Sequence, residues 1–473
     1  MTQQAISNPL SLIRYIRIPA GIIFLQCLTF VVLYSVWILP EIASWRNTSL
    51  VIGAVLGLYV SYQYRFLLLD KKALPIWLIG ILFIWAVFHL LFLSQNPDVQ
   101  LIEFKGIWKR ALLAVIFALG LGLSIANNTE RIKKWAWPLI YLGLLMPTLI
   151  YLLKWFLTFY GEVIFGFGSV PISMRIYVQS QPFYVPKSDY VVFCLPILAL
   201  ALGQLSTLLR ARRINWRSLL IYSATISAVT FLFYFQRIKN GIAYEFILTL
   251  LFLVIIFRNS WRTRKWNRLI IAACVMVLAT LLMIRHIQEH DSWRSFIEDA
   301  KVAVQLERYH HWRENGEKGL PLNGAGEMVS GTNYVRIAWG LVGFHLLLEN
   351  PYGFGLIENS FGPLVNKKWP ESSPNLSHSH SGWLDLALGL GLPGIILVLG
   401  ALVYALKEAD NLVAPWQNLG KWVLISILLL WCTTEVSNNG NFEPLLFWIV
   451  LTTSLALRIK ASLGNDRFVN GAN

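Results

Sequence analysis

Apolar runs of about 20 residues without charged side chains recur along the whole chain. A helix of this length crosses a membrane because it satisfies its own backbone hydrogen bonds there. Charged residues make up only 14% of the sequence, against roughly a quarter in soluble proteins. The sequence therefore predicts an all-α polytopic membrane protein with about twelve transmembrane helices. The runs lie near residues 19–39, 49–66, 75–95, 110–127, 136–158, 189–209, 218–235, 241–257, 268–285, 382–406, 420–434 and 444–458.

Basic residues follow every second run and account for most of the net charge of +15. Examples are Arg65 after the second run, Arg210 after the sixth and Arg258 after the eighth. Cytoplasmic connections carry such an excess, so we expect both termini to be cytoplasmic. The first run has no small-residue cleavage site and is expected to remain as an anchor. Placed in this way, the positive charge indicates contact with membrane lipids and not with nucleic acid.

One connection on the opposite side is long and polar. Residues 286–381 contain every histidine except His89. An apolar stripe predicts an amphipathic helix over residues 293–312, and a second helix is expected from about Thr332 to Asn350, before Pro351. The sequence thus divides into spans one to nine (1–285), a helical loop domain (286–381), and spans ten to twelve with a tail (382–473). We expect the functional site beside the loop domain.

Several cations lie on this side, where orientation gives them no role. They are Arg237 in a short turn, Arg175 and Lys187 before the sixth run, and Arg336 on the second loop helix. Each could place its charge among lipid headgroups. Guanidinium groups also bind phosphate oxygens in a forked geometry and stay charged at any relevant pH. The four are therefore candidates for holding a pyrophosphate at the membrane surface.

The stretch HSHSGWLDLALGLGLPG, residues 378–394, places His380 just before an apolar helix. The positive end of the helix dipole disfavours imidazolium and keeps the ring neutral, as a general base requires. Asp385, one turn inside, is expected to fix the imidazole tautomer or to cap a neighbouring helix. Gly391 is eleven residues after His380, close to three helical turns, and is expected on the same face. Gly391 and Gly394 would let another backbone or a lipid tail approach.

The sequence shows no complete metal site. His378 and His380 alone cannot complete a zinc shell, and no outward acidic pair suits Mg²⁺. The cysteines all fall in apolar runs, where we expect buried small hydrophobes and no thiol on the outer side. They are Cys27, Cys194, Cys274 and Cys432. We therefore predict neither a metal nor a cofactor.

The chain resembles the O-antigen ligase and O-antigen polymerase superfamily of bacterial envelope glycosyltransferases. The most specific match is H-S-x9-G-L-P-G, from His380 through Gly391 to Gly394. A second is Arg-x-x-Trp at R-I-A-W from Arg336, which leads into ENPYGFGLIENSF. Arg237 followed by Gly241 is similar to the short Arg-Gly turn of the family, although three residues intervene.

This resemblance implies a GT-C class fold in the bacterial inner membrane and a site at the periplasmic face. The implied donor is a glycan on undecaprenyl pyrophosphate, and the implied acceptor is a sugar hydroxyl of lipid A–core. Inversion at the anomeric carbon without a metal is expected. His380 would be the base, supported by His378 and Asp385. The four outward cations would bind the pyrophosphate.

Three alternatives remain open at this stage. Within the superfamily, the chain could be the polymerase that extends the lipid-linked glycan or a protein O-oligosaccharyltransferase. The histidine spacing favours the ligase over the polymerase. Outside it, a twelve-span transporter or lipid flippase would need acids near the membrane midplane. Asp385 is the only such acid that we find in the sequence, and it lies near a helix end.

Overall fold

The computed structural model describes residues 17–459, apart from residues 40, 167, 169, 178–182, 212–213, 434–440 and most of 263–290. Eight helical segments in this part of the chain are long and apolar enough to cross a membrane. They are built on α1 (Ala20–Trp37), α3 (Leu74–Phe92), α5 (Lys109–Ala126), α6 (Glu130–Phe156), α8 (Lys187–Arg210), α9 (Trp216–Phe235), α10 (Lys239–Arg262) and α16 (Gly382–Ala409).

Three further predicted spans correspond to helices outside this group of eight. Helix α2 (Ala43–Gln63) carries several polar residues in its first turns, and α17 (Trp416–Leu430) and α18 (Phe442–Ala456) are shorter. The predicted span at 268–285, which includes Cys274, lies largely outside the described residues. The all-helical membrane character is confirmed, whereas about twelve spans and the GT-C class stay predictions.

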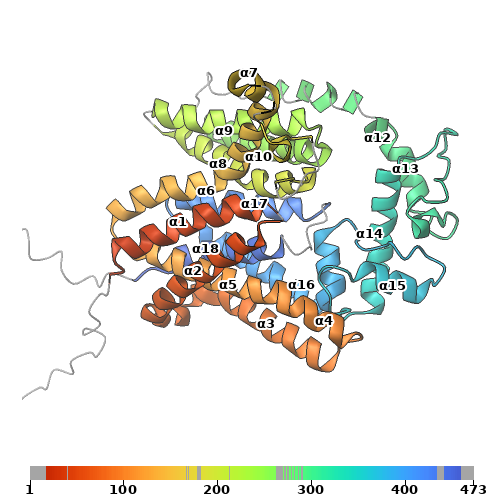
Figure 1. Ribbon diagram of the computed structural model, residues 1–473, viewed down its shortest axis with the longest axis horizontal. Helices are drawn as coiled ribbons and strands as arrows, with labels where there is room; N and C mark the ends of the chain where they lie inside the picture. Colours follow the sequence, from red (N-terminus) through yellow and green to blue (C-terminus); the bar gives the residue numbers. More distant parts are fainter. Residues whose placement is uncertain are drawn as a thin grey trace, which may run out of the picture.

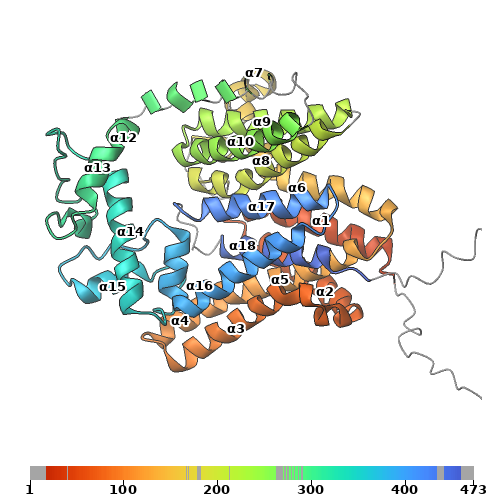
Figure 2. The same cartoon turned by 180° about the vertical axis from the view of Figure 1, so that it is seen from behind.

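Helix α18 lies at the centre of the apolar body, and every one of its residues is buried. It packs on α5, α16 and α17, and α5 packs in turn on α2 (Figure 1). A helix that is apolar all round needs neighbours on all sides, as this arrangement provides. Helix α8 has the same role in a second group, with α9, α10 and α17 around it (Figure 2).

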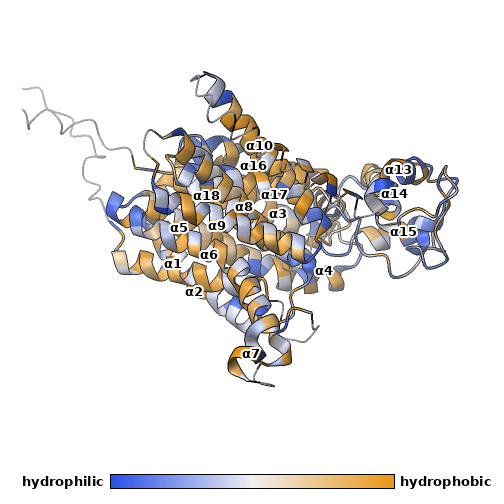
Figure 3. Ribbon diagram, turned by 90° about the horizontal axis from the view of Figure 1, so that it is seen from above, coloured by the Kyte–Doolittle hydropathy of each residue, from blue (hydrophilic) through white to orange (hydrophobic). Residues whose placement is uncertain are grey.

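A more polar module projects from one end of the apolar body (Figure 3). It contains α13 (Phe296–Ala303), α14 (Gly331–Glu349) and α15 (Phe361–Lys368). Its own core includes Trp312, Tyr334, Trp339 and Phe361, and this core continues into the first turns of α16. The start of α16 is therefore held by the module as well as by the membrane helices.

The expected amphipathic helix over residues 293–312 is wrong in its length. The structure has a short α12 (Asp291–Arg294) and then α13, which ends at Ala303. The chain turns after Gln305, and Trp312 enters the module core with 1% of its surface exposed. Burial of this large indole outweighs the local helical periodicity. The second expected helix is confirmed as α14, with bounds within two residues of the prediction.

Helix α16 is broken at Gly391, where φ is 71° and ψ is −175°. Residues 351–355 pair with its backbone at this point: Phe354 N donates to Leu388 O and Leu392 N donates to Pro351 O, both at 2.8 Å. A Cβ on Gly391 would lie 2.3 Å from the carbonyl carbon of Tyr352. The predicted close approach of another backbone is thus confirmed at Gly391. Gly394 meets Leu390 of its own helix, across the break.

Candidate functional site

His380 lies outside the helix that it precedes, because α16 begins at Gly382 with Ser381 as its N-cap. The backbone of His380 is left-handed, with φ 61°, which is uncommon for a residue other than glycine and is frequent at functional sites. The shared face expected for His380 and Gly391 is therefore wrong at both ends. His380 precedes the helix, and Gly391 interrupts it.

Two contacts hold His380 in this position. The buried Asp385 carboxylate accepts a hydrogen bond from Ser379 N at 2.7 Å, which fixes the loop just before the histidine. The imidazole stacks on Trp339 of α14, with ring centroids 5.1 Å apart and planes 8° apart. The indole Nε1 of Trp339 donates to Trp312 O at 2.9 Å and is itself fixed. The imidazole therefore has a defined plane before any ligand binds.

Arg336 precedes Trp339 by three residues, so both project from the same face of α14. Its guanidinium donates from Nη1 to Asn240 Oδ1 of α10 at 3.3 Å. The Asn240 side chain in turn donates to Thr433 O at 3.4 Å, after the end of α17. This chain of bonds joins three elements that are distant in sequence and directs the cation towards the imidazole.

Burial keeps His380 neutral. Loss of solvent, assisted by the positive charge of Arg336 and by His378, lowers the pKa of His380 to about 3. Burial also lowers the pKa of His378. The neutral imidazole predicted from the helix dipole is supported, but burial is the larger cause. At neutral pH the ring is therefore unprotonated, which is the state that a general base requires.

Two cavities meet at this point. The α10 cavity, of about 490 Å³, lies between α10, α13, α14 and the start of α16. The α14 cavity, of about 310 Å³, lies between α14 and the loop at Asn315–Gly316. Thr332, Arg336 and His380 line both. The imidazole and the guanidinium therefore lie where the linings of the two cavities meet.

The sequence model of the O-antigen ligase family matches residues 238–399. This stretch contains Lys239, Arg336, Trp339, His380 and the α16 break. This match supports membership of the O-antigen ligase superfamily. A search of curated proteins found no match. The match covers every residue that lines one cavity or the other, except for Cys432 and Thr433 after the end of α17 and the residues before 238–399 or after it that line neither.

Of the four predicted cations, only Arg336 lines the two cavities. Among the described residues, Arg237, Arg175 and Lys187 line neither cavity. Arg237 is exposed in the turn that ends α9, where Ile238 N donates to Phe233 O across a left-handed residue. Arg175 forms an ion pair with Glu162, and Lys187 is exposed at the start of α8. Their role in binding pyrophosphate stays a prediction.

Several residues that line the α10 cavity were not among the predicted site residues. Lys239 and Asn240 are the first residues of α10, directly after the turn of Arg237 and Ile238. Cys432 is exposed on the cavity wall, so the expectation that all cysteines are buried is wrong at this position. Its apolar neighbours in sequence gave no sign that α17 ends at Leu430.

Two acids inside apolar helices were also overlooked. Glu443 of α18 is buried and bonded to Arg110, and Trp37 Nε1 donates to it at 3.1 Å. Glu245 of α10 accepts a hydrogen bond from Thr230. The statement that Asp385 is the only acid within the apolar segments is therefore wrong. Both acids have polar partners from other helices, which stabilise a carboxyl group there. In the described part of the chain, no three His, Cys, Asp or Glu side chains group as a metal site.

Proposed function

We propose that this protein is an O-antigen ligase of the bacterial inner membrane. It transfers a glycan from undecaprenyl pyrophosphate to a sugar hydroxyl of lipid A–core at the periplasmic face. The observation that carries the proposal is the position of His380 and Arg336 on the boundary of two cavities. The transfer needs a base beside the acceptor hydroxyl and a cation beside the departing diphosphate. The family match suggests the substrate classes.

The α10 cavity suits the lipid-linked donor. Its walls include Trp293, Phe296 and Phe344, which can contact an isoprenoid chain, and its polar end carries Arg336 and Lys239. Two cations at the end of an apolar cavity match a pyrophosphate that joins a lipid to a sugar. The α14 cavity has small and polar residues on its walls and suits the acceptor sugar.

The reaction requires one proton transfer. The neutral His380 imidazole takes the proton of the acceptor hydroxyl as that oxygen attacks the anomeric carbon. The bond between this carbon and the diphosphate oxygen breaks, and the lipid diphosphate leaves with the bonding electrons. Arg336 and Lys239 stabilise the charge on the leaving group. Attack from the side opposite the leaving group inverts the anomeric configuration. His378 and Asp385 position the loop that carries the base.

Replacement of Arg336 by glutamine is expected to lower kcat/KM for the donor by about 10²–10³-fold, the usual effect of removing a donor that stabilises developing negative charge. Arg336→Lys should recover part of this loss because the positive charge returns without the fork. Arg308→Gln, which removes an exposed cation of the same module that lines neither cavity, is the matched control. Equal losses in Arg336→Gln and Arg308→Gln would exclude a specific contact with the donor.

The pH dependence follows from the low pKa of His380. The base is neutral above about pH 3, so kcat/KM should stay constant as the pH falls from 7.5 to 5. A histidine of ordinary pKa would lose activity below about pH 6.5. The charged or titratable groups near the ring are Arg336 of α14, Lys239 of α10, Asp385 of α16 and His378 of its own loop. An acid limb near pH 6.5 that Arg336→Gln leaves unchanged would contradict this electrostatic account.

The ligase and the polymerase of the superfamily give different products when they are lost. A bacterium without this chain should accumulate long glycans on the lipid carrier and should make lipid A–core without O-antigen. Single repeats attached to lipid A–core would instead identify a polymerase. Normal lipopolysaccharide, together with proteins that lack their usual glycans, would identify a protein O-oligosaccharyltransferase.

A further inference from the structure

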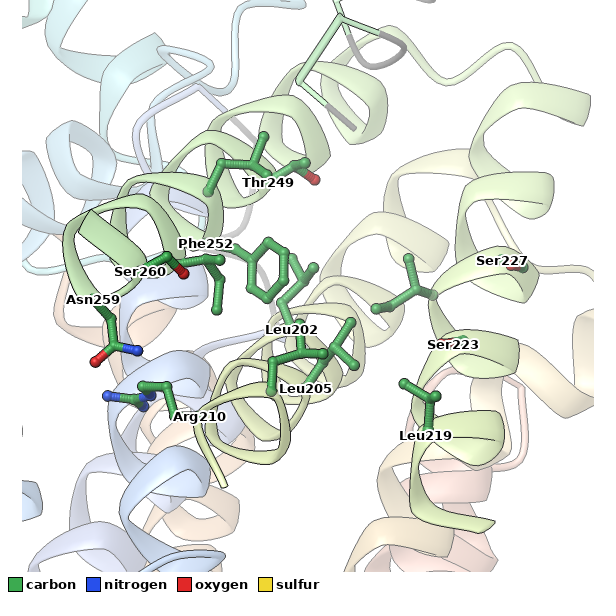
Figure 4. A pocket seen from close by; sticks show the side chains of 14 residues that line it. Leu202, Leu205, Arg210, Leu219, Ser223, Ser227, Thr249, Phe252, Asn259 and Ser260 are labelled. Atoms are coloured by element: carbon green, nitrogen blue, oxygen red, sulfur yellow. The ribbon is translucent and has the colours of Figure 1, made fainter. Parts of the chain in front are cut away.

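Apart from the α10 and α14 cavities, a groove lies between α8, α9 and α10 (Figure 4). It is near the end of α10 that is opposite to Lys239. It has a volume of about 380 Å³. Its length is apolar, with walls formed by Leu202, Leu205, Leu209, Phe252, Leu253 and Ile256. One end is polar. There, Arg210 of α8 and Asn259 of α10 lie near each other at the mouth of the groove.

Arg210 is fixed at this mouth. Its Nε donates to Ser206 O at 3.0 Å, and Nη2 lies 3.4 Å from the Ser206 and Thr207 hydroxyl oxygens. These bonds use part of the guanidinium, which carries further N–H donors on Nη1. The side chain is exposed, so these donors can reach a ligand outside the helix. Arg210 thus offers an oriented cation at the end of an apolar channel.

The charge around the mouth has one sign. Arg217 lies in the first turn of α9, and Arg258 and Arg262 lie in the last turns of α10. From residue 200 to residue 262 the sequence has one acid, Glu245, which is in the half of α10 next to Lys239. Basic residues at helix ends attract anionic lipids, and a basic pocket between membrane helices can bind a lipid headgroup.

We propose that this groove binds one anionic glycerophospholipid from the leaflet that meets the basic ends of α8, α9 and α10. One acyl chain lies along the leucines of α8, and the phosphate bonds to Arg210. A soluble anion would leave the apolar walls without a ligand, and a zwitterionic headgroup would cancel part of the attraction. The site is separate from His380 and takes no part in glycan transfer.

Retention of lipid by the purified full-length protein tests this proposal, with native mass spectrometry after exchange into detergent with phosphatidylglycerol or phosphatidylcholine. The native protein should retain phosphatidylglycerol in preference to phosphatidylcholine. Arg210→Gln removes the cation, and Leu205→Trp fills the channel. Each substitution should weaken retention of phosphatidylglycerol about tenfold. Arg65→Gln, which removes an exposed cation of a distant connection on the same predicted membrane side, should change it little, because Arg65 does not line the groove.

Three results would overturn the proposal. Equal loss in Arg65→Gln and Arg210→Gln would show a diffuse surface attraction. Unchanged retention in Leu205→Trp would place the lipid outside the groove, and equal retention of the two lipids would exclude recognition of the headgroup. Melting temperatures identify any variant that fails to fold. If either Leu205→Trp or Arg210→Gln fails, the other variant decides the outcome.

Discussion

Asparagine in place of His380 should reduce glycan transfer by about 10²–10⁴-fold, the range for loss of a general base. Asparagine cannot take the hydroxyl proton, but it tolerates the left-handed backbone that this position requires. The variant should therefore fold normally. Initial rates with purified protein, together with its melting temperature, measure the effect.

Trp339 supplies a matched test of how the base is positioned. Trp339→Phe keeps an aromatic face for the imidazole but removes the hydrogen bond to Trp312 O. It should reduce the rate far less than His380→Asn does. If His380→Asn retains more than a tenth of native activity while folded, the imidazole is not the base.

Alanine at Gly391 should destabilise the protein by about 2–4 kcal/mol, because its φ and ψ are nearly exclusive to glycine and the new Cβ meets backbone. The clash is with Tyr352, in the segment that holds α16 against the module. Transfer should fall as well, because His380 lies in the loop that leads directly into α16. Thermal unfolding in detergent, compared with the native protein, measures the loss.

Gly80→Ala is the control for this glycine. Gly80 lies within α3, and a Cβ there would meet no atom within 4 Å. Alanine should leave the stability unchanged or slightly higher, since glycine is a poor helix residue. If Gly391→Ala unfolds at the same temperature as the native protein, the pairing between residues 351–355 and α16 does not hold the site.

The membrane helices could be predicted because a lipid environment leaves few solutions for an apolar run of this length. The place of His380 followed from the same boundary, where polar residues give way to Trp383 and the apolar residues after it. These features depend only on residues close in the sequence. The structure agrees on the helical membrane character and on the position of His380 just before α16, and about twelve spans stay a prediction.

The features that the sequence did not predict depend on distant partners. The stacking of Trp339 on His380 joins residues 41 positions apart, and the bond between Arg336 and Asn240 spans 96. Arg110, which neutralises Glu443, is 333 residues away. Periodicity within one segment carries no information about such pairs. The overestimated length of the amphipathic helix has the same reason. Trp312 contacts Trp339 of α14 and Trp369, which directly follows α15, and both are distant in the sequence.

The most direct test is glycan transfer from undecaprenyl pyrophosphate to lipid A–core by the purified protein, with EDTA present. We expect the native protein to transfer the glycan at the same rate with and without the chelator, and folded His380→Asn to be nearly inactive. Transfer that stops with EDTA and returns with a divalent metal would contradict charge stabilisation by Arg336 and Lys239. Full activity in His380→Asn would contradict the proposed base.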